Sequence, residues 1–335
     1  MVGLNPTNLT TEELCDLGSA IDSTLCVVLK VAPRRESEII EGRIASTIGR
    51  AWKSTANAAT NSGIAKLLKG PFTDRRITSF LKSLGVKLKT PLTKTQIKVI
   101  EKRLQSIWRI AKKWAAKEAK ISFSFSHVDQ RAVAAINRHQ VFWVGDFYND
   151  KLSRRIRAVS EDVLLRRGLS HKEAGAVLRR TLRREFGILP GGKTRFAPTV
   201  PARYAGNPDL YFRQVASTAA HQSRTFGTLT AFSEAGVTSY QLINPDDERT
   251  GQICQQMSGQ VFSVQTGVRQ MNRILGAKDP KDVKKIAPWL SGDDIEAALA
   301  GARTGSQQAT DRLAAAGAIL PPFHALCRTD IVIPS

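Results

Sequence analysis

Apolar residues recur every three or four positions along most of the first 235 residues, a spacing typical of amphipathic helices. The most regular stripe runs from Ile97 to Trp114, and Lys and Arg fill the opposite face. Gly85 and Gly236 fall where helices are expected to end. The pattern predicts helices over residues 10–32, 36–68, 73–84, 93–119, 129–168, 170–186 and 209–234.

Strict alternation of apolar and polar residues, which is typical of strands, occurs in two short stretches near the C-terminus, 237–243 and 329–333. A third alternating stretch, 121–126, is either an edge strand or a linker. The predicted fold class is therefore predominantly α, and α+β overall, with a small C-terminal β-sheet. Residues 265–318, between the two strands, have the composition of a helical insertion.

The charge of the chain is concentrated in its N-terminal part. The 50 Lys and Arg outnumber the 29 Asp and Glu, which gives a formal net charge of +21. Residues 50–120 hold 18 of these basic residues against three acids, and residues 151–195 hold 13 against four. Such a chain is expected to meet a polyanion, most often nucleic acid. We expect a basic helical N-terminal region over 1–125 and a second domain over 126–335.

The polar face of the predicted 93–119 helix is the most concentrated basic surface. It is either an ordinary solvated helix face or a surface that lies against DNA or an acidic partner. The residues that would make the second kind of contact are Lys98, Lys102, Arg109, Lys112, Lys113 and Lys117.

Several classes of protein are disfavoured. The acids among the first 22 residues are of the wrong sign for a signal peptide or presequence, and no apolar run is long enough for a membrane span. The four scattered cysteines favour a reducing compartment. Gly187–Thr194 matches a phosphate-binding loop by pattern, but an Arg-rich helix precedes it and two prolines follow. No catalytic motif is evident, so we predict that the chain is not an enzyme.

Two motifs flank the insertion and carry the clearest functional signal. The first comprises Asp247, Arg249, Thr250, Cys254, Gly259, Val261 and Phe262, and the second comprises Pro321, Pro322, His324, Cys327 and Arg328. In this order the motifs resemble those of the phage Mu F-like minor head proteins, the head-morphogenesis family of tailed phages and prophages. Many members carry a second Cys in each motif, where this chain has Gly251 and Thr329.

The resemblance covers residues 126–335 and implies a function. It implies a minor capsid protein of the virion, incorporated near the portal during viral head assembly in the host cytoplasm. The implied partners are the portal protein, major capsid or scaffold proteins, and packaged double-stranded DNA, which the basic N-terminal half would contact. Two alternatives stay open: a free DNA-binding protein without a virion role, and a nuclease or toxin-type effector.

The chemistry of the two motifs depends on whether they meet in space. If they do, Cys254, Cys327, His324 and Asp247 supply four side chains of the types that bind zinc. We favour a reduced, metal-free packing cluster in which carboxylates and arginines of the motifs pair, and we therefore predict no resident cofactor. The alternatives are a structural zinc site, a disulfide between the two cysteines, and a Cys–His nucleophile.

Overall fold

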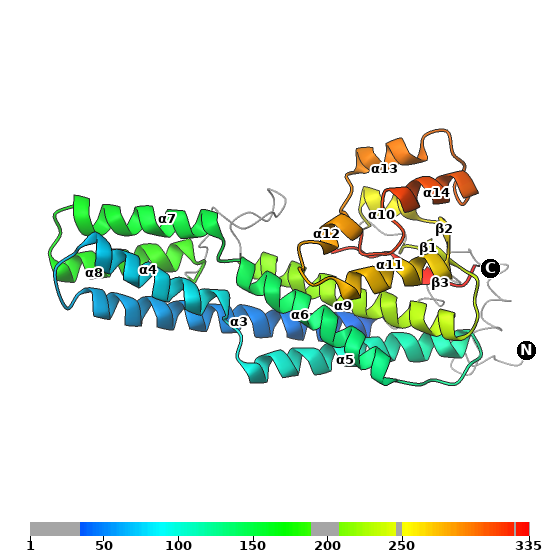
Figure 1. Cartoon of the computed structure of the whole chain (residues 1–335), viewed down its shortest axis with the longest axis horizontal. Coiled ribbons are helices and arrows are strands. Elements are labelled where there is room, and N and C mark those ends of the chain that lie inside the picture. The colour runs from blue at the N-terminus through cyan, green and yellow to red at the C-terminus, as the bar shows by residue number, and fades with distance from the viewer. Residues whose placement is uncertain (1–33, 189–207, 246–249, 325, 335) are drawn as a thin grey trace, which may run out of the picture. The chain divides into compact units, whose positions relative to one another are not determined.

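A computed structural model describes residues 34–188, 208–245, 250–324 and 326–334 of the chain (Figure 1). In these ranges the protein is predominantly α-helical with one small antiparallel sheet, which confirms the predicted fold class. The helix predicted over 10–32, and most of the loop predicted over 187–206, lie outside the described residues. No helix in the described part of the chain is long and apolar enough to cross a membrane.

Long helices make up the first two thirds of the described chain and short ones the last third. The helices before the sheet are α3 (Arg34–Leu67), α4 (Asp74–Lys89), α5 (Lys94–Glu118), α6 (His127–Asp146), α7 (Asp150–Glu161), the π-helix η1 (Asp162–Arg166), α8 (His171–Glu185) and α9 (Pro208–Glu234). The later helices are α10 (Gln252–Met257), α11 (Val264–Gly276), α12 (Val283–Ile286), α13 (Gly292–Leu299) and α14 (Gln307–Ala315).

Local polar contacts fix several helix ends where the sequence predicts them. Ser170 and Glu173 form a reciprocal capping box at the start of α8, so two otherwise unsatisfied N–H groups are bound. Gly187 and Gly236 follow α8 and α9 with φ of 64° and 71°, the left-handed conformation that glycine adopts without a steric penalty. The predicted 129–168 segment is divided instead, because Asn149 caps a new helix through the Leu152 N–H.

The prediction at Gly85 is wrong, because α4 continues through this residue to Lys89. The missing side chain serves close packing there: a Cβ on Gly85 would lie 3.2 Å from the Tyr148 ring. Residues 121–126 form an extended connection without strand partners, so the linker alternative holds. Ser126, its last residue, donates through its N–H and hydroxyl to the carboxylate of Asp129, which lies in the first turn of α6.

The sheet has three antiparallel strands in the order β2–β1–β3, with β1 (Ser239–Ile243) in the centre. Tyr240 of β1 pairs with Phe262 of β2 (Val261–Ser263), and Leu242 pairs with Ile331 of β3 (Asp330–Val332). All four of these side chains are buried. Strand β3 is therefore paired with a strand that precedes it by about 90 residues. Figure 1 shows the three strands close together.

The described part of the chain divides into two compact units. Unit 1 holds the described residues of 34–38, 105–133 and 220–335, and unit 2 holds those of 39–104 and 134–219. Four long helices pass from one unit into the other, so neither unit is a continuous stretch of sequence. In unit 1, residues 265–318 form α11 to α14, with α13 against α14 and α10.

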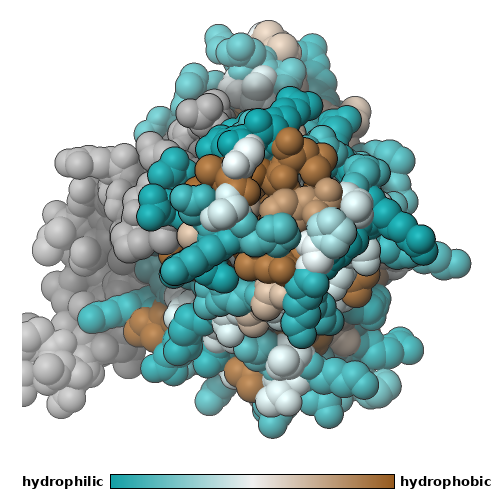
Figure 2. All heavy atoms as spheres, turned by 90° about the vertical axis from the view of Figure 1, so that its left-hand side faces the viewer, coloured by the Kyte–Doolittle hydropathy of each residue, from teal (hydrophilic) through white to brown (hydrophobic). Residues whose placement is uncertain are grey.

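Unit 2 has an aromatic core around Trp52. The Trp52 ring meets Phe147 edge-on at 4.8 Å, and its Nε1–H donates to the Phe186 carbonyl oxygen. Helix α7 packs against α4 and α8. Figure 2 views the end of this unit, where apolar side chains gather within a hydrophilic surround. Leu165 of η1, 48% exposed, and the basic Arg166 and Arg167 after it are among the exposed residues of this unit.

Unit 1 has a buried charge cluster in place of a wholly apolar core. Lys112 of α5 is fully buried, and its Nζ lies 2.9 Å from Asp129 Oδ2 and 2.7 Å from Glu234 Oε1. Asp129 also accepts a hydrogen bond from Trp108 Nε1 at 3.0 Å. Helices α5, α6 and α9 are thereby joined through one buried ammonium group, which is paired with two carboxylates.

Candidate functional site

The two C-terminal motifs meet in unit 1. Cys254 lies in the first turn of α10, the short helix that starts after Gly251. His324 and Cys327 belong to the segment that connects α14 to β3, which has no regular secondary structure in its described residues. Because β3 pairs with β1, the strand that precedes α10 in the chain, it brings this segment back beside α10. Residues some 70 positions apart in the sequence thus come together.

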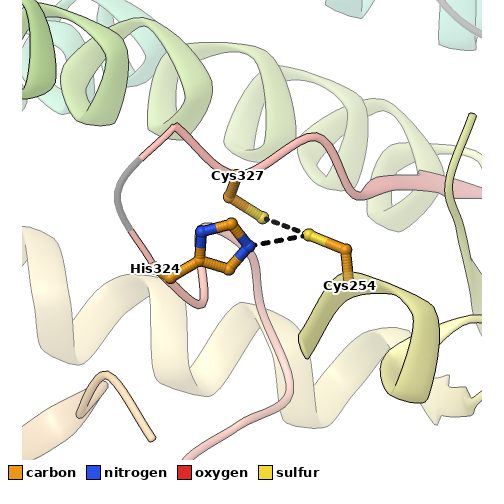
Figure 3. Close-up of side chains that lie close together, drawn as sticks. All are labelled: Cys254, His324 and Cys327. Atoms are coloured by element: carbon orange, nitrogen blue, oxygen red, sulfur yellow. Dashed lines mark hydrogen bonds between the residues drawn. The ribbon is translucent and has the colours of Figure 1, made fainter. Parts of the chain in front are cut away.

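The three side chains point toward one another (Figure 3). Cys254 Sγ lies 2.8 Å from His324 Nε2 and 3.7 Å from Cys327 Sγ. All three ligand-type atoms lie within 4.8 Å of one another. Cys254 is 1% exposed and Cys327 6%, while His324 is half-buried. The cluster is therefore compact and largely closed to solvent.

The two thiols differ in pKa, because their sulfur atoms have different surroundings. The bond from the Cys327 thiol, followed by contact with His324, holds the pKa of Cys254 well below its usual value. Burial and the neighbouring Cys254 sulfur raise the pKa of Cys327. Backbone hydrogen bonds, that of Arg328 at Cys254 and those of Thr329 and Phe323 at Cys327, act to lower the pKa of each thiol.

Residues of the first motif shape the turn that presents Cys254. Thr250 is buried, and its hydroxyl donates to the Pro245 carbonyl oxygen. Gly259 has a φ of 80°, and its N–H donates to Leu242 at 2.8 Å, so it links α10 back to the central strand. Asn244, which the sequence reasoning missed, donates through Nδ2 to the Cys254 carbonyl oxygen. The predicted site residues Asp247 and Arg249 lie outside the described residues.

The second motif is anchored by a buried ion cluster that the sequence analysis did not find. Asp330 accepts from Arg34 and from Arg224, each at 2.7 Å, and all three side chains are at most 16% exposed. Arg34 also donates to the Arg328 carbonyl oxygen. Pro321 is buried at the start of the motif, and Pro322 is half-buried. In the sequence Asp330 was marked only by its place inside the predicted 329–333 strand.

The predicted basic face is present except at one residue. Lys98 and Lys102 are exposed on the part of α5 that belongs to unit 2, and the part in unit 1 exposes Arg109, Lys113 and Lys117. Arg109 lies over the Phe125 ring, with its guanidinium carbon 4.1 Å from the ring centre. The expectation that Lys112 contacts a polyanion is wrong, because this lysine is buried and ion-paired.

The geometry allows three kinds of chemistry: metal binding, disulfide formation and thiolate–imidazole nucleophilicity. Burial of Cys254 argues against the last, since a substrate must reach the sulfur. Two surface hollows of unit 1, one at α11, α12 and α14 and one beside β1 and β2, contain none of the three side chains. Comparison with known proteins adds no further constraint: no family model, curated protein or solved structure matches the chain.

Proposed function

We propose that this chain is a minor capsid protein of a tailed phage or prophage that enters the head near the portal during assembly. The single observation that carries the proposal is the meeting of the two C-terminal motifs. Cys254, His324 and Cys327, which resemble the signature of Mu F-like minor head proteins in sequence, also converge in space. A chance resemblance between two distant segments gives no reason for such convergence.

A structural role fits this site better than a catalytic one. The sulfur of Cys254 is shielded, and the surrounding contacts connect α10, the central strand and the segment before β3. Such contacts fix the relative positions of chain segments. We therefore propose that the motifs stabilise the domain for assembly and that the protein is not an enzyme.

The exposed lysines and arginine of α5 support contact with DNA or an acidic head protein. Each cation that neutralises a phosphate releases a counterion, so DNA binding through this face falls steeply as salt rises. The same face is the observation that favours the second candidate function, a free DNA-binding protein. The two functions differ in whether the chain also binds head components.

Co-sedimentation separates them. The purified full chain is mixed with isolated heads or portal rings, and in parallel with double-stranded DNA, at low and moderate salt. We expect the chain to sediment with heads or portal rings. Binding to DNA alone, with the chain left in the supernatant in the presence of heads and portal rings, would overturn the proposal and favour the DNA-binding protein.

Two variants with the same charge change test the basic face. Lys113→Glu and Lys117→Glu should each weaken DNA binding, because each removes a cation from the contact. Each should also reduce the slope of log affinity against log salt concentration by about one unit. Lys278→Glu makes the same change at an exposed residue outside α5 and should leave both quantities close to those of the unaltered chain. Equal effects of all three changes would show that only net charge matters.

A further inference from the structure

We propose that Cys254, His324 and Cys327 bind one Zn²⁺ ion, which fastens α10 to the segment before β3. This replaces the metal-free cluster favoured from the sequence, and it does not depend on the phage function. Two thiolates and an imidazole are ligands that zinc prefers in proteins, and all three ligand atoms lie within 4.8 Å of one another.

The separation of the two sulfurs fits a tetrahedral zinc ion. With Zn–S bonds of about 2.3 Å, two sulfurs on one zinc lie about 3.8 Å apart. The observed distance between Cys254 Sγ and Cys327 Sγ is 3.7 Å. A disulfide needs the sulfurs at about 2.0 Å, so it requires a much larger movement. The distance between Cys254 Sγ and His324 Nε2 is 2.8 Å. It would increase to about 3.5 Å when both atoms bind the ion.

The ion also cross-links two segments of the chain that have little stability of their own. Helix α10 is only six residues long, and the segment that carries His324 and Cys327 has no regular structure, so neither is stable on its own. An ion bound by both closes a loop of some 70 residues and adds its binding free energy to folding. The three side chains leave the fourth position of a tetrahedral ion for water.

Metal content and a cobalt spectrum test the site directly. The full chain is prepared under reducing conditions in a Cys15→Ser/Cys26→Ser background, so that Cys254 and Cys327 are the remaining thiols. We expect about one zinc per chain by elemental analysis, and on replacement by Co²⁺ the visible bands of a tetrahedral thiolate site. Absence of bound zinc together with absence of these bands would overturn the proposal. So would a preparation whose mass shows the two sulfurs joined with loss of two hydrogens.

Single substitutions then assign the ligands. Cys254→Ser, Cys327→Ser and His324→Ala should each remove most of the bound zinc and the cobalt bands. His221→Gln serves as the control, because this histidine is buried elsewhere in unit 1 and bonded to Thr225 at 3.1 Å. Zinc retained at the unaltered level by the three ligand variants would contradict the assignment.

A variant that adds a ligand tests the site even if the variants that remove ligands fail to fold. A Cβ on Gly251 would lie 3.9 Å from His324 Cε1, an ordinary contact, and the φ of −71° suits any residue. Gly251→Cys should therefore add a third thiolate, raise the sulfur-to-cobalt charge-transfer absorption by about one half and slow zinc loss to a chelator. Unchanged absorption and unchanged chelator sensitivity would count against a metal site beside residue 251.

Discussion

At the scale of single residues, the two neighbouring lysines of α5 have opposite environments. Lys112 is fully buried between Asp129 and Glu234, whereas Lys113 is exposed. The amphipathic pattern places both lysines on the polar side of the helix, because lysine is counted as polar whether its ammonium group is buried or exposed. The sequence could not show that acids from α6 and α9 would meet Lys112, since these acids lie 17 and 122 positions away.

Removing the buried charge should destabilise the fold. Lys112→Met leaves the buried Asp129 without its cation, and we expect it to lower the free energy of unfolding by about 3–5 kcal/mol. Lys113→Met should change it by less than about 0.5 kcal/mol, because that side chain is solvated. Urea unfolding followed by circular dichroism measures both. Similar losses from the two variants would contradict the ion cluster as an element of the core.

At the scale of helices and strands, periodicity and capping residues predicted most of the architecture. The capping box at Ser170 and the glycine after α8 follow from local chemistry, which sequence displays directly. The expectation at Gly85 was wrong, and the 121–126 stretch could not be decided, because the same local signal has two uses. A glycine either ends a helix or lets a neighbouring side chain pack closely against the helix. An alternating stretch forms a strand only when another strand lies beside it.

Close approach of helices gives a test with matched glycines. A Cβ on Gly145 of α6 would lie 2.3 Å from the Lys89 carbonyl oxygen, a backbone atom that cannot move aside alone. Gly145→Ala should therefore destabilise the protein by about 1–3 kcal/mol. Gly42 of α3 has nothing within 4 Å of that position, so Gly42→Ala should stabilise it by about 0.5–1 kcal/mol. Thermal unfolding of the two variants would refute the packing if both shifts had the same sign.

At the scale of the whole chain, the sequence order hides how distant segments combine. The two motifs could be named from sequence, and the three residues that meet could be chosen as candidates. The contacts that make them meet could not, because they depend on the return of β3 to β1 and on Asp330 binding Arg34 and Arg224. Four helices have residues in both units, and the sequence gives no signal for that sharing, because each of these helices is one uninterrupted pattern.

The burial of His221, next to the arginines that hold Asp330, makes unit 1 sensitive to acid. Burial, followed by the charges of Arg224 and Arg34, lowers the pKa of His221 well below its ordinary value. The folded chain keeps this histidine neutral, whereas the unfolded chain protonates it below a pH of about 6.5. Stability from this group is therefore complete above that pH and falls as the pH decreases, by up to about 1.4 kcal/mol per pH unit.

His221→Gln should remove this part of the pH dependence. Between pH 7 and pH 5, the urea midpoint of the unaltered chain should fall more than that of the variant, and the two should run parallel above pH 7. Equal slopes below a pH of about 6.5 would show that His221 does not stay neutral in the fold.

The most direct test of the account is whether the chain is part of a phage head. Particles are isolated from the cells that encode it, separated by density from soluble protein, and analysed by quantitative mass spectrometry alongside a His324→Ala/Cys327→Ser form of the chain. We predict that the unaltered chain is found in the head fraction with the portal protein and that the altered form is depleted from it. Recovery of the unaltered chain only in the soluble fraction, with heads assembled normally, would contradict the account.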